Sequence, residues 1–242
     1  MGKAGMIFFD IDGTLVDHKG AERAAAFSFQ RDFAKIFPGP PDEFASRWQT
    51  LAEKHVRRYL AGELSFQDQR RARIRELFAL EGSVADNEAD SIFSVYLKRY
   101  EQNWRLFADV ESCLTDIAGH GLGIISNGDS KQQRAKLQVL GIAERFSTVL
   151  ISGDIGKAKP ETGIFVLACQ NAGKRPDECL YVGDDFEVDA MASRRAGMRG
   201  IWLNRTGMDR PSRNDMIRSL TELVNQIGSH NNLPQSPPRA AG

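Results

Sequence analysis

The sequence predicts an α/β protein with a Rossmann-like parallel sheet, covered by helices on both faces, and an inserted all-helical cap. Three observations lead to this prediction. From residue 105 onward, short apolar runs alternate with helical patterns, which is typical of parallel strands joined by crossover helices. An isolated apolar run at residues 6–10 precedes them. Between these two parts, residues 19–104 show helical periodicity and no convincing strand pattern.

The first strand, at residues 6–10, is an apolar run without alternation, as expected for a strand buried on both faces. Further strands are expected where comparable short runs recur, at residues 122–125, 148–151, 179–182 and 199–203. Helices are expected between and after them, at residues 109–120, 130–140, 160–172, 186–196 and 211–226. The alternation of the two sets predicts one parallel sheet.

Four helices are expected in the insert, at residues 21–37, 42–60, 65–80 and 87–104. Four consecutive helices suggest a small bundle that is inserted as one unit. The predicted domains are therefore an α/β core formed by residues 1–18 and 105–228, a helical cap formed by residues 19–104, and a tail at residues 229–242. The tail is rich in Pro, Asn, Ser and Gly, so we expect it to be disordered.

Composition excludes several classes of function. The chain has 242 residues, enough for a sizeable core, and its 32 Lys and Arg balance its 32 Asp and Glu. Without net charge, the protein as a whole does not attract nucleic acid or an anionic membrane. No apolar run reaches the length of a membrane span, and the first strand begins too early for a signal peptide. Cys113, Cys169 and Cys179 are too few for a disulfide framework or a zinc site. We expect a cytoplasmic monomer or homodimer.

Two carboxylates follow the first strand, in the stretch F-F-D-I-D-G-T-L at residues 8–15. Residues i and i+2 of an extended chain point to the same side, so Asp10 and Asp12 should leave the strand together. Gly13 follows, where the backbone must turn or approach a ligand. For an isolated D-x-D motif, an acidic turn would be the simpler interpretation. Two acids directly after a buried strand instead predict a cation or a shared proton that offsets their repulsion.

The stretch F-F-D-I-D-G-T-L resembles the first motif of the haloacid dehalogenase (HAD) superfamily of aspartate-nucleophile hydrolases. The predicted architecture is also similar to that family, in which a helical cap is inserted between the first and second motifs. The resemblance covers most of the chain for architecture, but it is sharp only over about twenty residues.

Polar side chains follow the predicted core strands at their carboxyl ends, where ligands bind in open α/β sheets. In chain order they are Asp10 and Asp12, then Ser126 and Asn127, then Lys159, and then Asp184, Asp185 and Asp189. Taken singly, Ser-Asn-Gly is an ordinary turn and Lys-Pro is an ordinary helix start. Their order and spacing together predict one crevice that collects all four groups.

These groups suit phosphoryl transfer, which depends mainly on positioning and charge neutralisation. Asp10 would attack phosphorus and form an aspartyl-phosphate. Asp12 would protonate the leaving oxygen and then deprotonate water. Lys159 would supply a fixed positive charge beside the nucleophile and the phosphate, and Ser126 and Asn127 would hydrogen-bond the phosphoryl oxygens. The family resemblance implies the same roles for Asp10 and Asp12, and it matches Ser126 to the second motif and Lys159 to the third.

A divalent cation, Mg²⁺, is expected at the same crevice, because it commonly takes one or two carboxylates together with a substrate phosphate. Asp184 would help to hold it. The resemblance implies the full ligand set, namely the Asp10 carboxylate, the Asp12 backbone carbonyl and Asp184. Supporting positions are expected at Thr14, Asp185 and Asp189.

We therefore predict a magnesium-dependent phosphatase that acts on a small phosphorylated metabolite. A haloacid dehalogenase would need neither the second acid nor the metal, so Asp12 and Asp184 argue against that alternative. A phosphomutase and a catalytically silent binding module of the same fold stay open, although no catalytic residue is missing. A sugar-nucleotide transferase would not require Lys159. Sugar phosphates, phosphoglycolate, nucleoside monophosphates and flavin mononucleotide are all possible substrates.

The third helix of the insert carries arginines on its apolar side. The apolar arc is formed by Phe66, Ile74, Leu77 and Phe78. Arg70 and Arg73 lie inside this arc, whereas Arg71 and Arg75 lie outside it. An arginine on a buried face needs an anionic partner, which is either an acid within the bundle or the substrate. We predict that the insert is a mobile lid and that Arg70 contacts the substrate from it.

Overall fold

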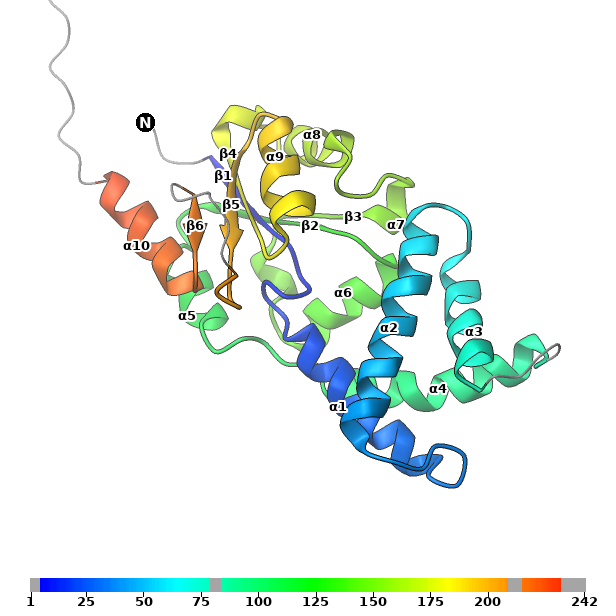
Figure 1. Ribbon diagram of the computed structural model, residues 1–242. Coiled ribbons are helices and arrows are strands. Elements are labelled where there is room, and N and C mark those ends of the chain that lie inside the picture. Colours follow the sequence, from blue (N-terminus) through cyan, green and yellow to red (C-terminus); the bar gives the residue numbers. More distant parts are fainter. Residues whose placement is uncertain (1–4, 79–83, 209–214, 232–242) are drawn as a thin grey trace, which may run out of the picture.

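The computed structural model describes residues 5–78, 84–208 and 215–231 of the chain. Its centre is a six-stranded parallel sheet with the order β3-β2-β1-β4-β5-β6 (Figure 1). The strands are β1 (Met6–Phe9), β2 (Gly121–Ser126), β3 (Thr148–Ile151), β4 (Cys179–Gly183), β5 (Arg199–Leu203) and β6 (Met216–Ile217). The predicted α/β fold is confirmed, and five of these strands fall where the apolar runs predict them.

Strand β1 occupies the middle of the sheet because it pairs in parallel with both β2 and β4. Its last residue, Phe9, lies opposite Ile124 on one side and Val182 on the other. All four of its side chains are buried, which explains why the run is apolar throughout. The first residue after this strand, Asp10, therefore lies at the centre of the carboxyl edge.

Helices cover both faces of the sheet, as predicted. Side chains of α5 (Val110–Asp116), α6 (Ser130–Val139) and α10 (Leu220–Asn231) share a core cluster with Ile7 and Phe9 of β1. Side chains of α8 (Thr162–Asn171) and α9 (Ala192–Arg195) share a second cluster with Met6 and Phe8. Successive residues of β1 thus point to opposite faces, as a pleated strand requires. The shorter elements are η1 (Ala143–Arg145), α7 (Ser152–Ile155), η2 (Pro176–Glu178) and the π-helix η3 (Phe186–Met191).

The carboxyl-terminal part of the core differs from the prediction. Within the expected helix at 211–226, Met216 and Ile217 instead pair with β5 as the edge strand β6, and α10 begins only at Leu220. Ile217 is fully buried by this pairing, a gain that overrides the helical pattern. Helix α10 continues to Asn231, so the predicted tail at 229–242 begins too early. Residues 209–214 and 232–242 lie outside the described part. The expected helix at 186–196 is divided between η3 and α9.

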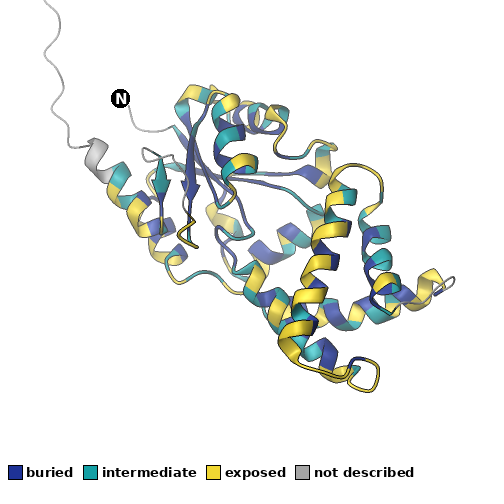
Figure 2. Cartoon of the chain, in the orientation of Figure 1, coloured by how far each residue is buried: buried dark blue, intermediate teal, exposed yellow. Residues whose placement is uncertain are grey.

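Four helices form the insert, namely α1 (His18–Asp32), α2 (Pro41–Leu60), α3 (Phe66–Leu77) and α4 (Asp86–Gln102). They enclose an aromatic cluster of their own around Trp48, whose ring lies 4.3 Å from Tyr96 and 5.7 Å from Phe29. Buried residues line the inner sides of these helices, while the outer side of α2 is exposed (Figure 2). The last residues of the predicted third helix, 79 and 80, lie outside the described ranges.

Two neighbouring segments connect the bundle to the sheet. The Asp17 N–H donates to Arg105 O (3.0 Å), and the Phe107 N–H donates to Leu15 O (3.0 Å). The Arg105 guanidinium adds an ion pair to Asp17, with a nitrogen–oxygen distance of 2.7 Å. Entry to and exit from the bundle therefore lie side by side. In the described residues, no helix has the length and apolar composition needed to span a membrane.

Candidate active site

Asp10 and Lys159 form the buried centre of the crevice. The Asp10 N–H continues the sheet by donating to Val182 O (2.9 Å), which fixes the residue just beyond β1. Its carboxylate accepts a hydrogen bond from Lys159 Nζ (2.7 Å). The same ammonium group donates to Asp189 Oδ1 (2.7 Å) and to the Tyr181 hydroxyl (2.9 Å). One lysine thus joins Asp10, which directly follows β1, to a residue of β4 and a residue of η3.

Burial and charge act in opposite directions on Asp10. Desolvation raises the pKa of its carboxyl group, Lys159 lowers it, and Asp189 raises it again, with a net pKa of about 6. Desolvation also lowers the pKa of Lys159, but Asp10 and Asp189 raise it more, so this lysine stays charged. The fixed positive charge expected beside Asp10 is therefore present.

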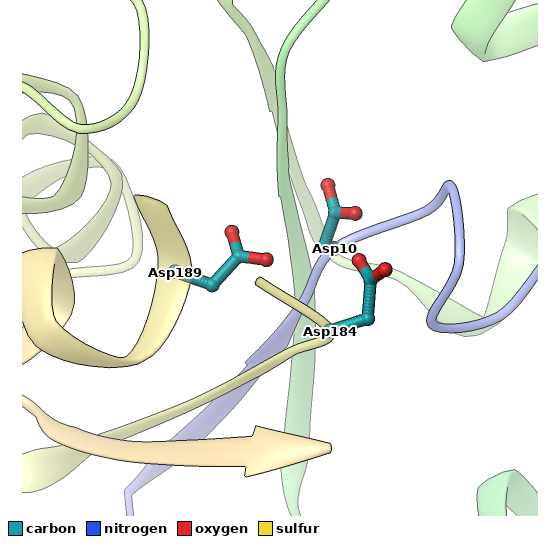
Figure 3. A group of neighbouring side chains, drawn as sticks. All are labelled: Asp10, Asp184 and Asp189. Atoms are coloured by element: carbon teal, nitrogen blue, oxygen red, sulfur yellow. The ribbon is translucent and has the colours of Figure 1, made fainter. Parts of the chain in front are cut away.

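Three carboxylates converge at the ends of β1 and β4 (Figure 3). One oxygen each of Asp10, Asp184 and Asp189 lies within 4.8 Å of the others. Both oxygens of Asp189 are occupied, because Oδ1 accepts from Lys159 and Tyr181 and Oδ2 accepts from the Asp185 N–H. Asp184 makes no comparable hydrogen bond or ion pair to the described residues. Among the described residues, the Asp184 carboxyl group therefore has neither a hydrogen-bond donor nor an ion-pair partner.

Electrostatics at Asp184 indicate a cation site. Burial, Asp10 and Asp189, in that order, raise the pKa of Asp184 to about 8. An all-oxygen donor set with excess negative charge fits a hard divalent cation, which would relieve this repulsion. Gly13 makes room for the approach, since it has φ 82° and a Cβ at this position would lie 2.2 Å from Asp184 Oδ2. Asp184 is held in turn by Trp202, whose indole N–H donates to its backbone carbonyl (3.0 Å).

Asp12 lies in a different environment from Asp10. Lys136 Nζ donates to both of its carboxylate oxygens (2.6 and 2.8 Å), and the Gln133 amide donates to Oδ2 (2.9 Å). Although burial raises the pKa of Asp12, Lys136 and the nearby His18 lower it to about 2. The two predicted catalytic acids thus have well separated pKa values. Strand β1 ends at Phe9, so strand geometry alone does not fix the direction of Asp12.

The predicted phosphate-binding residues hold the crevice together. The Asn127 amide donates to Lys159 O (2.9 Å), and its carbonyl oxygen accepts from the Lys159 N–H (2.8 Å). The Asn127 side chain is therefore occupied in positioning Lys159. Ser126 is buried, and its hydroxyl accepts from the Gln133 amide (3.1 Å). Asn127 thus contacts Lys159, and Ser126 contacts Gln133, which also donates to Asp12.

The supporting residues fall into different environments. Thr14 is fully buried and its hydroxyl has no hydrogen-bond partner, while its carbonyl accepts from Arg205 (2.8 Å). Asp185 is exposed and caps η3, because its Oδ1 accepts from the N–H groups of Glu187 (2.9 Å) and Val188 (2.8 Å). Asp189, by contrast, lies within the charged centre.

Three polar residues of the site were not predicted from the sequence: Gln133, Lys136 and Tyr181. A signal for two of them exists, because Gln133 and Lys136 lie on the same helical stripe as Leu137 of α6 and Leu140, the residue that caps this helix. A lysine on an apolar stripe needs a buried anion. Tyr181 lies within the apolar run of β4 and carries no comparable signal.

A cavity of about 160 Å³ separates the core from the insert. Asp12, Asn127 and Lys136 line it from the core side. From the insert, Arg70 lies in the same cavity, with its guanidinium carbon 4.3 Å from the ring centre of Phe66. Arg70 therefore lines the cavity between core and insert, and its contact with a substrate stays a prediction.

The fold and the site define an α/β protein with a lysine and carboxylate crevice at the carboxyl edge of its sheet. The model of the haloacid dehalogenase-like hydrolases matches residues 5–197, and the chain belongs to this family. The family resemblance that the sequence motifs indicated is confirmed.

Two relatives and one solved structure extend this result. N-acylneuraminate-9-phosphatase from Rattus norvegicus is 26% identical over 231 residues, which cover 90% of this chain and 91% of that protein. Glyceraldehyde 3-phosphate phosphatase from Methanothermobacter thermautotrophicus is 31% identical over 207 residues, which cover 82% and 84%. The HAD-hydrolase YfnB from Bacillus subtilis, solved with bound magnesium, shares the fold with a TM-score of 0.79 and 23% identity, over 94% of this chain and 100% of that one. The predicted class of enzyme, a hydrolase of phosphate esters, is confirmed by these phosphatases.

Proposed function

We propose that the protein is a magnesium-dependent phosphatase that hydrolyses a small phosphorylated metabolite through an aspartyl-phosphate on Asp10. One observation carries the proposal: the Asp10 carboxylate lies at the end of the central strand between Lys159 and the unpartnered Asp184. The cation would be held by Asp10, the Asp12 backbone carbonyl and Asp184. When bound, Mg²⁺ would neutralise charge on the phosphoryl oxygens.

In the first half-reaction, a bond forms between an Asp10 oxygen and phosphorus while the ester bond to the leaving oxygen breaks. Lys159 keeps Asp10 ionised and in place, and the Ser126 hydroxyl would donate to a phosphoryl oxygen. Asp12 is ionised in the free protein because its pKa is about 2. The proton for the leaving oxygen would therefore enter with the substrate monoanion and pass through Asp12.

In the second half-reaction, Asp12 would take a proton from water, which attacks phosphorus and releases Asp10 and inorganic phosphate. The ionised form needed for this step is the form that Lys136 and Gln133 stabilise. The dehalogenase alternative would leave Asp12 and Asp184 without a role. A phosphomutase requires the same aspartyl-phosphate and differs only in the acceptor that replaces water.

The insert, residues 19–104, is proposed as a cap domain and mobile lid over the core formed by residues 1–18 and 105–228. Its two connecting segments lie side by side, which suits a hinge, and the cavity lies between the two parts. Closure would exclude bulk water while the aspartyl-phosphate forms. Arg70 would contact a polar or anionic group of the substrate from this lid. The three buried free cysteines support a reducing cytoplasm as the location.

A phosphate-release assay over a panel of metabolites tests the function. The panel should include N-acylneuraminate 9-phosphate and glyceraldehyde 3-phosphate, which the names of the relatives suggest, as well as phosphoglycolate, a nucleoside monophosphate and flavin mononucleotide. We expect release from at least one compound with Mg²⁺ and none with excess EDTA. Chloride release from 2-chloropropionate that is unchanged by EDTA would instead establish the dehalogenase.

A further inference from the structure

Arg73 is a buried cation without an anionic partner. It is 6% exposed, and its Nε has no hydrogen-bond partner among the described residues. In the described part of the chain, no carboxylate lies within ion-pair distance of its guanidinium. Its described contact is with the face of Phe93, 5.8 Å from the guanidinium carbon to the ring centre. An unpaired charge at this depth is costly, so a partner that is absent from the protein itself is expected.

The place of Arg73 on α3 directs it to the cavity between core and insert. Gln69, Arg70 and Arg73 follow one another at helical spacing on one side of α3, and all three line this cavity. Gln69 is 1% exposed, and its amide oxygen also lacks a hydrogen-bond partner. One helix face thus offers a guanidinium to an anion and an amide oxygen to a neighbouring donor.

The other charged groups of the cavity do not satisfy Arg73. The two carboxylates that line the cavity are Asp12 and Glu22. Asp12 is held by Lys136, and Glu22 faces His18 at 3.4 Å. Burial lowers the pKa of Arg73, and Tyr96, Glu22 and Tyr100 offset this only in part. None of these three residues forms an ion pair or a hydrogen bond with Arg73. Arg71, on the outer side of the same helix, shows the contrasting case, since it pairs with Asp90 at 2.7 Å.

We propose that Arg73 binds a second oxyanion of the substrate, so that the substrate is a phosphate monoester that also carries a carboxylate or a second phosphate. The proposal rests on the proposed function, because it requires the phosphate of the substrate to bind at Asp10. The two ends of the substrate can share one cavity, since Asp12, two residues after Asp10, lines the same cavity as Arg73. The phosphate would lie at Asp10 and the second anion at α3, with a hydroxyl or amide N–H of the substrate facing Gln69. The guanidinium group of an arginine is planar and can donate two parallel hydrogen bonds to an oxyanion, so Arg73 suits this role.

Cavity size limits the part of the substrate between the two anions. The cavity measures about 160 Å³, close to the roughly 150 Å³ of an engineered cavity that holds benzene. A chain of about three to six carbons is therefore the expected spacer.

Matched pairs of substrates test this inference. 3-Phosphoglycerate carries a carboxylate where glycerol 3-phosphate carries a hydroxymethyl group. Fructose 1,6-bisphosphate carries a second phosphate where fructose 6-phosphate carries a hydroxyl group. We expect kcat/KM of the wild type with Mg²⁺ to be at least tenfold higher for the more acidic member of one pair, and the pair that responds identifies the anion. Arg73→Met should reduce this ratio to near one, and Arg73→Lys should retain part of it. Arg71→Met serves as the control that keeps the ratio.

Thermal unfolding separates substrate binding from a structural role. Removing an unpaired buried charge should leave the melting temperature of Arg73→Met equal to or above that of the wild type. A lower melting temperature together with equal losses on all four substrates would show that Arg73 serves the bundle, for example by balancing Glu22. A wild type without preference in either pair, or an Arg73→Met variant that keeps the preference, would equally overturn the inference.

A binding measurement keeps the inference distinct from the proposed function. In Asp10→Asn with Mg²⁺, the rise in melting temperature should be larger with the more acidic member of the responding pair, and Arg73→Met in this background should remove the difference. Failure of the wild type to release phosphate from any compound would overturn the proposed function alone. Equal thermal shifts within both pairs would overturn the inference alone.

Discussion

Replacing Asp184 with Asn should stabilise the metal-free protein, although it removes a proposed metal ligand. The pKa of Asp184 is raised from 3.8 to about 8 by burial and by the neighbouring acids. A difference of about 4 pKa units corresponds to an upper limit of roughly 5 kcal/mol, at about 1.4 kcal/mol per unit. Because the side chain is only partly buried and the site can relax, we expect about 2 kcal/mol at pH 8. For a chain of this size, that is about 4–8 °C in melting temperature.

The pH dependence of this gain has a defined sign. An acid whose pKa is higher in the folded than in the unfolded state binds more protons when folded, so its contribution to stability falls as pH rises from about 4 to about 8. The advantage of Asp184→Asn in EDTA should therefore be largest near pH 8 and small near pH 4. Asp116→Asn, at an exposed position of α5, makes the same change in net charge and should show no such trend.

Thermal unfolding in EDTA, repeated with Mg²⁺, measures both parts of the expectation. Mg²⁺ should stabilise the wild type more than Asp184→Asn, because the variant lacks the carboxylate whose repulsion the cation relieves. A variant that melts at or below the wild-type temperature at pH 8 in EDTA would refute the electrostatic reasoning. Equal stabilisation of both proteins by Mg²⁺ would refute the assignment of Asp184 as a ligand.

Three further predictions concern other charged contacts. Asp10→Asn should lower steady-state phosphate release at least about a thousandfold without lowering the melting temperature, and activity in a deamidation-free sample would contradict the mechanism. Lys136→Met removes the cation that holds the pKa of Asp12 near 2, so the acid limb of the kcat/KM profile should move to higher pH; an unmoved limb would exclude Asp12 as the titrating group. Arg205→Met leaves Asp109 without its bidentate partner, and we expect a loss of about 2 kcal/mol in urea unfolding; unchanged stability would show that this pair is neutral.

The sequence predicted the position of the site better than the hydrogen-bond and ion-pair partners of its acidic residues. Asp10 and Ser126 could be placed because each directly follows an apolar run, and Asp184 follows such a run after one glycine. The carboxyl ends of parallel strands meet at one edge of the sheet. That inference needs only local pattern and fold class. The partners of each acid depend on which face of α6 turns inward, a tertiary property that periodicity only outlines. Lys136 carried the signal of a charge on an apolar stripe, but the stripe does not specify which anion it meets.

The edge of the sheet shows a second limit of sequence-based prediction. Met216 and Ile217 form only two residues of strand, too short for a detectable period of two, and they precede a helix that was expected to include them. Their conformation is decided by pairing with Trp202 and Leu203 of β5. The insert shows the converse, because its helical stripes predicted all four helices, although the first spans His18–Asp32 where residues 21–37 were expected. The unpaired state of Arg73 became visible only once the neighbouring acids were located.

The chemical difference between Asp10 and Asp12 arises outside the motif that contains them. Asp10 is buried, Asp12 is partly exposed, and each faces one lysine that lies outside the motif. Lys159 is shared among Asp10, Asp189 and Tyr181, whereas Lys136 donates to both oxygens of Asp12. A shared cation offsets burial only in part, so the pKa of Asp10 is about 6 while that of Asp12 is about 2. The lysine supplied by α6 thus keeps Asp12 ionised, the form that the proposed mechanism needs to accept a proton from water. The carboxyl groups of Asp10 and Asp184 are less completely neutralised by lysine, which suits the proposed binding of a divalent cation between them.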